Sequence, residues 1–145
     1  MRLVLDASVV IKWFLEDPTA EDDVDQALEI LGTLRGGSLE VLQPVHWLVE
    51  VAAVLTRLQP DSAGRALDLL DAMELAVVSD HATLRRASDL AHRLHHHLFD
   101  TLYHAVALEH EAILVTADQT YWKRARRLGG IALLSSWGQQ ITAGS

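Results

Sequence analysis

Residues 112–118 read AILVTAD, and this stretch decides the fold. It is short and almost continuously apolar, contains the β-branched residues Ile113, Val115 and Thr116, and ends in Asp118. That composition is typical of a strand buried on both faces of a parallel sheet. The same pattern recurs in RLVLD (2–6), LAVVS (75–79) and IALLS (131–135), with LEVLQP (39–44) as a weaker fifth candidate.

Longer amphipathic segments separate these strands. They predict helices over 19–34, 45–58, 61–73, 82–95, 99–110 and 118–128. For the first of these helices, Thr19 is the expected N-cap and Gly36-Gly37 the expected end. Strands that alternate with helices indicate an α/β fold, here a small parallel sheet of about five strands flanked by helices. No repeat or linker divides the sequence, so we expect one domain over residues 1–145.

Composition limits the setting in which the protein works. The chain has no cysteine, which excludes disulfides, zinc-thiolate sites and a thiol nucleophile, and favours a reducing compartment such as the cytoplasm. The apolar run near the N-terminus is interrupted by Asp6 and Lys12 and is too short to cross a membrane. The formal net charge is −8, but residues 81–145 hold 7 basic and only 5 acidic side chains. An acidic protein with a local basic face remains compatible with binding nucleic acid.

Acidic side chains follow two of the predicted strands. Asp6 ends the first strand and Asp118 ends the stretch 112–118. The carboxyl ends of parallel strands meet at one edge of a sheet, where ligands usually bind, so we expect these carboxylates to share a site. Thr116 points to the same side as Asp118 because side chains alternate along a strand. The competing interpretation is that both aspartates only cap helices; Ser8 is expected to cap a helix that starts near Val9.

Two further carboxylates join them. Glu50 borders the apolar face of the helix over 45–58, and a carboxylate removed from water needs a counter-charge, either a metal ion or a side chain such as Arg57. Asp100 lies at the start of the helix over 99–110, where the helix dipole also favours an acidic residue. Together, the four carboxylates predict an oxygen-ligand site for Mg²⁺ or Mn²⁺, suited to hydrolysis of a nucleic-acid backbone.

Histidines surround Asp100 and suggest an alternative metal site. The stretch HRLHHHLFDTLYHAVALEHE (92–111) holds six of the eight histidines in the chain. Three of them are consecutive, so they point to different sides, and the helix must break near Leu98. We therefore expect residues 95–97 to be solvated side chains at a helix end. His104, one turn after Asp100, is a candidate hydrogen-bond donor that orients this carboxylate.

The stretches LVLDASVVIKWFLED, QPVHWLVEVAAVLTRL and LFDTLYHAVALEHEAILVTAD resemble, in order and spacing, the signature stretches of PIN-domain ribonucleases, especially VapC-type toxins. The resemblance implies a PIN-like fold and RNA cleavage by one or two Mg²⁺ or Mn²⁺ ions held at Asp6, Glu50, Asp100 and Asp118, with Thr116 beside them. It also implies a homodimer and a cognate antitoxin protein that places an Arg or Lys in the acidic site. Ala53 and Phe99 depart from the usual Asn and Tyr, which puts a substrate-orienting contact in doubt.

Substrate contacts are expected from cations around the site, with Lys12, Lys123 and Arg124 as the named candidates and Ser8 as a supporting polar group. Two alternatives stay open: a PIN-like module that binds RNA or protein without cleavage, and a nuclease directed at DNA. A phosphatase of the haloacid dehalogenase type is disfavoured, because it needs an Asp where Ser8 stands. A receiver domain is disfavoured because the last strand is not followed by the Lys it requires.

Overall fold

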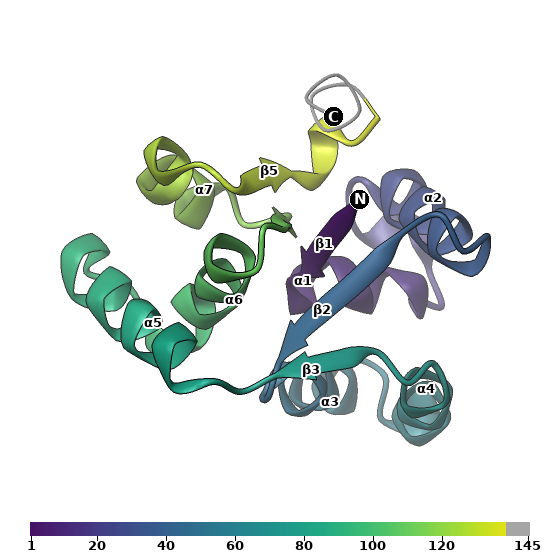
Figure 1. Ribbon diagram of the computed structural model, residues 1–145. Coiled ribbons are helices and arrows are strands. Elements are labelled where there is room, and N and C mark those ends of the chain that lie inside the picture. The colour runs from purple at the N-terminus through teal and green to yellow at the C-terminus, as the bar shows by residue number, and fades with distance from the viewer. Residues whose placement is uncertain (139–145) are drawn as a thin grey trace.

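The computed structural model describes residues 1–138 and shows one parallel sheet of five strands with helices packed on both sides (Figure 1). The strands are β1 (Arg2–Leu5), β2 (Glu40–Pro44), β3 (Ala76–Val78), β4 (Ile113–Thr116) and β5 (Ile131–Leu133). The helices are α1 (Ala7–Val10), α2 (Val24–Arg35), α3 (Trp47–Leu58), α4 (Pro60–Ala72), α5 (His81–Leu94), α6 (Leu98–Glu109) and α7 (Gln119–Ala125). Short 3₁₀ turns cover Ile11–Trp13, Pro18–Ala20, Arg126–Leu128 and Leu134–Ser136. The predicted fold class is confirmed.

The order of the strands in the sheet is β3-β2-β1-β4-β5. The chain therefore moves outward from β1 through β2 to β3 and then crosses back to β4 on the other side of β1. In Figure 1, α5, α6 and α7 lie on one side of the sheet and α1 to α4 lie on the other. A reversal of strand order opens a crevice at the carboxyl ends of the two strands that flank it. Here those strands are β1 and β4, which lead directly into Asp6 and Asp118.

The core forms around the two central strands. Leu3, Val4 and Leu5 of β1 are fully buried, as is Val115 of β4. Strand β3 differs from its prediction, because it is not buried on both faces and Val77 is 52% exposed. The reason is its place at the edge of the sheet, where it pairs only with β2. An apolar stretch of three residues predicts a strand, but not whether helices cover it.

Two predicted helix starts are wrong. Thr19 does not cap α2; its backbone N–H and hydroxyl both donate to Asp17, which caps the 3₁₀ turn Pro18–Ala20. Helix α2 begins only at Val24, after Asp23 in a left-handed conformation (φ 62°). Ser8 does not cap a helix near Val9 either, since α1 begins at Ala7. In both places a local side-chain hydrogen bond competed with the expected cap.

One buried polar side chain joins the strands beneath the site. Gln43 of β2 is fully buried, and its amide accepts from the N–H of Leu5 and donates to the C=O of Leu5, both at 2.9 Å. The backbone ladder between β1 and β2 pairs Arg2 with Glu40 and Leu3 with Val41. The Gln43 side chain therefore satisfies the last residue of β1, immediately before Asp6. Within residues 1–138, no helix has the length and apolar character needed to cross a membrane.

Candidate metal centre

Asp6 lies directly after β1 and is held by two hydroxyl groups. Thr116 Oγ1 donates to Asp6 Oδ2 at 2.6 Å, and Ser8 Oγ donates to the same oxygen at 3.1 Å. Burial raises the pKa of Asp6 above its ordinary value; the hydrogen bond from Thr116 opposes this, and the negative charge of Asp100 adds to it. Although Asp6 stands at the start of α1, its side chain makes no capping bond, so it is not merely a cap.

Thr116 and Ser8 connect Asp6 to the loop after β4. Besides donating to Asp6, Thr116 Oγ1 accepts from the backbone N–H of Asp118 at 3.0 Å. Ser8 Oγ similarly accepts from the N–H of Ala117 at 3.0 Å. Each hydroxyl thus donates to the Asp6 carboxylate after β1 and accepts from a backbone N–H in the loop after β4. Thr116 therefore contacts the Asp6 carboxylate directly.

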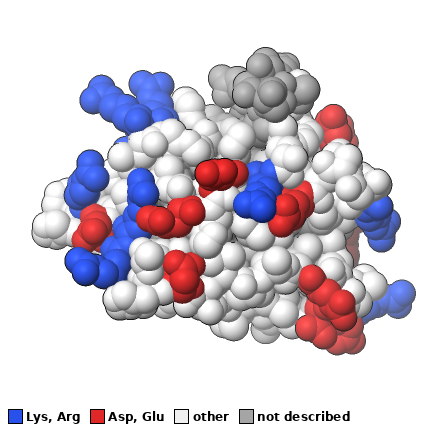
Figure 2. All heavy atoms as spheres, viewed as in Figure 1, with Lys and Arg blue, Asp and Glu red and all other residues white. Residues whose placement is uncertain are grey.

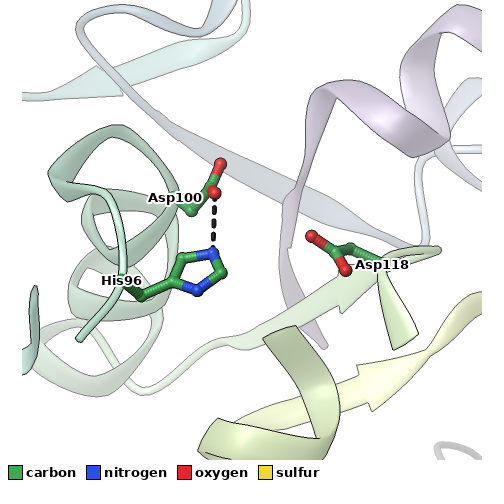
Figure 3. A group of neighbouring side chains, drawn as sticks. All are labelled: His96, Asp100 and Asp118. Atoms are coloured by element: carbon green, nitrogen blue, oxygen red, sulfur yellow. Dashed lines mark hydrogen bonds and ion pairs between the residues drawn. The ribbon is translucent and has the colours of Figure 1, made fainter. Parts of the chain in front are cut away.

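Asp118 caps a helix and also lies beside another carboxylate, so both interpretations considered from the sequence apply to it. Its Oδ1 accepts from the N–H of Tyr121 at 3.0 Å and so caps α7. Its carboxylate also faces the Asp100 side chain across the end of the sheet (Figure 3). Ligand atoms of Asp118, Asp100 and His96 all lie within 4.8 Å of one another, a spacing that can hold a metal ion.

Glu50 reaches the same region from α3. Tyr103 donates its hydroxyl to Glu50 Oε1 at 3.0 Å, and His46 Nε2 lies 3.6 Å from Oε2. Burial raises the pKa of Glu50 to about 7; repulsion from Asp6 and Asp100 adds to the rise, and the Tyr103 hydrogen bond opposes it. The alternative partner considered from the sequence, Arg57, is not among these contacts.

His96 corrects the prediction made for the histidine run. Its side chain is only 10% exposed, and its Nε2 lies 2.8 Å from Asp100 Oδ2 (Figure 3). It is therefore not a solvated side chain at a helix end. Helix α5 ends at Leu94, and His95 takes a left-handed conformation (φ 50°) that turns the chain toward α6. The spacing of four residues between His96 and Asp100 was the available signal, but the expected helix break obscured it.

His104 is also placed differently from its prediction. It is fully buried, its Nδ1 lies 2.9 Å from the Tyr121 hydroxyl, and its Nε2 lies 2.8 Å from the backbone oxygen of Gly129. Both ring nitrogens are therefore engaged away from Asp100. Burial lowers the pKa of His104, which favours the neutral ring that this arrangement needs. The role expected for His104 is taken by His96.

The cations named as substrate contacts lie in different surroundings. Lys12 is only 5% exposed, and its ammonium group is 2.9 Å from Glu21. Lys123 and Arg124 are exposed on α7, and Arg124 donates to the backbone oxygen of His95 at 3.0 Å. Figure 2 shows basic side chains gathered over α5 and α7, and the view includes several acidic side chains nearer its centre. The basic residues of these elements and of the following turn are Arg85, Arg86, Arg93, Lys123, Arg124, Arg126 and Arg127.

The donor set fits a hard divalent cation. Asp6, Glu50, Asp100 and Asp118 come from four separate places in the chain. The charge of Asp100 raises the pKa of Asp6, and the charges of Asp6 and Asp100 raise the pKa of Glu50. Like charges are brought together at a cost unless a cation neutralises them. Carboxylate oxygens are the ligands that Mg²⁺ and Mn²⁺ prefer.

Comparisons with known proteins identify the family and the fold. The family model of the PIN domain matches residues 3–128. The fold is similar to the crystal structure of VapBC2 from Rickettsia felis bound to a DNA fragment from their promoter, with 16% identity and a TM-score of 0.63 over 92% of this chain and 97% of that one. It is also similar to PAE2754 from Pyrobaculum aerophilum, with 17% identity and a TM-score of 0.64 over 99% of this chain and 96% of that one. No curated protein matches the sequence.

Proposed function

The chain belongs to the PIN-domain family, and on that premise we propose that it is a metal-dependent endoribonuclease, the toxin of a type II toxin–antitoxin pair. The observation that carries the proposal is a group of acidic side chains near the carboxyl ends of β1 and β4: ligand atoms of Asp100 and Asp118 lie within 4.8 Å of each other, and the charge of Asp100 raises the pKa of both Asp6 and Glu50. A domain that only bound RNA or protein would have no use for such mutual repulsion. We take residues 1–145 as a single PIN-like domain that works in the cytoplasm.

In this proposal Asp6, Glu50, Asp100 and Asp118 hold Mg²⁺ or Mn²⁺. Thr116 fixes the position of Asp6 relative to the start of α7 through its hydrogen bonds to Asp6 and to the N–H of Asp118. The bound ion supplies positive charge for the phosphodiester and activates water for attack. Without a metal ion the pKa of Glu50 is raised to about 7, so the bound cation is expected to ionise this carboxylate near neutral pH. Tyr103, through its hydrogen bond, keeps the Glu50 side chain directed to one place.

The substrate approaches the acidic centre from the basic side of the molecule. Lys123, the arginines of α5, and Arg126 and Arg127 of the turn after α7 supply the cations that attract a phosphate backbone. Lys12, also proposed as a substrate contact, would have to leave Glu21 first. These contacts favour an entry of RNA on the side of α7 over one on the side of α1.

An antitoxin protein is the proposed partner. The Rickettsia felis structure is described as VapBC2, a complex of two kinds of chain, with a fold like that of this protein. Residues 1–80 of this protein hold 15 acidic and 5 basic side chains, which suits a basic partner segment that reaches the carboxylates. A homodimer is part of the same proposal.

Cleavage assays test the nuclease. Antitoxin-free protein is incubated with labelled RNA and with DNA of matched sequence, with Mg²⁺, with Mn²⁺ or with EDTA. We expect RNA cleavage that requires the metal and that Asp6→Asn and Asp118→Asn abolish. Asp68→Asn, an exposed residue of α4, is the matched control and retains activity.

Each alternative corresponds to a different result. Cleavage of DNA in preference to RNA would make the protein a deoxyribonuclease. Tight binding of a varied RNA library without cleavage would make it a binding module. Cleavage that persists in both aspartate variants would exclude the proposed site.

A further inference from the structure

His96 stands between the metal centre and a basic side chain. It lies in the turn between α5 and α6, with its Nε2 2.8 Å from Asp100 Oδ2 and its Nδ1 3.3 Å from Arg124 Nη1. The Tyr121 ring packs edge-on against the imidazole, with ring centroids 4.8 Å apart. Arg124 is itself fixed, since the same Nη1 donates to the backbone oxygen of His95 at 3.0 Å. Contacts from α6 and α7 therefore determine where the His96 ring lies.

These contacts fix the tautomer of His96. A guanidinium group has donors only, so His96 Nδ1 must accept from Arg124 and carries no proton. The ring proton is then on Nε2, which donates it to Asp100 Oδ2. With a proton on Nε2, this nitrogen has no lone pair for a metal ion while Arg124 remains in place.

We propose that His96, with its tautomer fixed by Arg124, is a positioning residue that holds Asp100 for metal binding. The inference rests on the proposed function and deepens it. Among the described residues, His96 is the one hydrogen-bond partner of the Asp100 carboxylate, and the Asp100 side chain is 36% exposed, so without His96 it would be free to rotate. The hydrogen bond from His96 removes that freedom and occupies one carboxylate oxygen, which leaves the other for the ion.

The same geometry gives Arg124 a role different from direct substrate binding. It lines a cavity of about 560 Å³ together with His92, His96, His97 and Thr120, which opens beside the metal centre. Its guanidinium group is already committed to His95 and His96. A change at Arg124 is therefore expected to alter the centre itself, whereas a change at Lys123, the preceding residue of α7, is not.

Nuclear magnetic resonance of the metal-free protein tests the tautomer directly. Nitrogen-15 shifts of the imidazole are expected to show His96 with a protonated Nε2 and an unprotonated Nδ1. In Arg124→Ala the preference should weaken, so that the two nitrogen shifts move toward each other, and in Lys123→Ala it should not. A protonated Nδ1 in the wild type, or an unchanged His96 in Arg124→Ala, would overturn the proposal.

Metal affinity tests the positioning role. Mn²⁺ binding is followed by electron paramagnetic resonance for wild type, His96→Ala, His96→Gln and the control His92→Gln, an exposed residue of α5. We expect His96→Ala to weaken binding on the order of 10- to 100-fold, and His96→Gln, which keeps an N–H at the reach of Nε2, to recover most of the loss. Circular dichroism of each variant checks that the protein is folded.

Pulsed measurements on the Mn²⁺-loaded protein separate positioning from coordination. If His96 acts through Asp100, no directly bonded nitrogen is coupled to the ion. A strong nitrogen coupling that disappears in His96→Gln would overturn the proposal and make His96 a ligand. An unchanged affinity in a folded His96→Ala would overturn it as well. None of these measurements involves RNA. A failure to cleave RNA would therefore reject the proposed nuclease activity, while the tautomer and metal-binding results would still decide whether His96 positions Asp100.

Discussion

Glu50 carries its carboxylate in surroundings that oppose its charge. Burial and the neighbouring Asp6 and Asp100 raise its pKa from 4.5 to about 7. Unlike a carboxylate in a salt bridge, such a group costs stability when it ionises. The folded protein without metal therefore stores a strain that a bound cation relieves.

This strain predicts a pH dependence. Between about pH 4.5, where unfolded Glu50 ionises, and about pH 7, the folded state holds more protons, so the free energy of unfolding falls as pH rises through this window. Glu50→Gln removes this contribution and should be more stable than wild type near neutral pH in EDTA. Urea unfolding at a series of pH values measures the free energy of unfolding of both proteins. The difference between wild type and Glu50→Gln at each pH gives the contribution of Glu50.

The exposed Glu29 of α2 supplies the control for this experiment. Glu29→Gln should keep the wild-type profile, and Mg²⁺ or Mn²⁺ should flatten the wild-type profile but not that of Glu50→Gln. Parallel profiles for wild type and Glu50→Gln would show that Glu50 is not strained.

Thr116 gives a second test at the scale of one residue. In Thr116→Val the shape is kept, but Asp6 loses a donor and the N–H of Asp118 loses an acceptor. We expect a loss of about 1–3 kcal/mol in stability for the unsatisfied buried groups. Metal affinity should fall on the order of 10- to 100-fold. Thr116→Ser, which keeps the hydroxyl, should restore both; calorimetric titration with Mn²⁺ and thermal unfolding report the two effects.

At the scale of elements, the site depends on how β1 is held between its neighbours. Its backbone pairs with β4 through three residues, from Leu3 to Leu5, and with β2 through two. At Leu5 the β2 side is satisfied by the Gln43 side chain in place of backbone. The position of Asp6 thus rests on an amide from a strand 38 residues away.

Removal of that amide should be costly. Gln43→Leu leaves the N–H and the C=O of Leu5 without partners in the core, and we expect a loss of about 2–4 kcal/mol in the free energy of unfolding. Gln26→Leu, on α2, is the control for the change from amide to alkyl side chain. Chemical denaturation measures both. If Gln43→Leu were as stable as Gln26→Leu, the hydrogen bonds between Gln43 and Leu5 would not contribute to stability.

For the whole molecule, charge is divided between the two halves of the chain. Most of the acidic residues precede residue 81, whereas α5, α7 and the turn after it carry a run of exposed arginines and Lys123. Figure 2 shows most of the basic side chains in view on the left, over α5 and α7, with some acidic side chains among them. A net charge of −8 therefore does not describe the face that RNA would approach.

Binding of RNA should accordingly depend on salt. In the cleavage-deficient Asp118→Asn background, Lys123→Ala is expected to weaken RNA binding and to reduce the slope of log affinity against log salt by about 0.7, the value for one phosphate contact on a single strand. Arg65→Ala, exposed on α4, is the matched control and should change neither. Fluorescence anisotropy over a range of salt concentrations measures the slope, and an unchanged slope for Lys123→Ala would remove this residue from the proposed RNA contacts.

The strands and most helices followed from the sequence, because continuous apolar runs and amphipathic spacing reflect burial directly. Helix starts were less accurate: at Thr19 and Ser8 the side chain bonds a nearby partner that the spacing does not reveal. The exposure of β3 was missed for a related reason, since an edge strand has the same composition as a central one. The errors at the helix starts come from local side-chain hydrogen bonds, and the error at β3 comes from its place in the sheet.

The sequence by itself determined the parallel sheet, the alternation of helices and strands, and the acidic residues that end β1 and β4, since each depends on local composition and period. The tertiary structure decided which histidine serves the centre. His96 meets Asp100 because His95 turns the chain with a positive φ, and His104 is drawn to Tyr121 and Gly129. Hydrogen bonds between residues distant in the chain, such as Gln43 to Leu5 and Thr116 to Asp6, arise only once the sheet has brought their strands together.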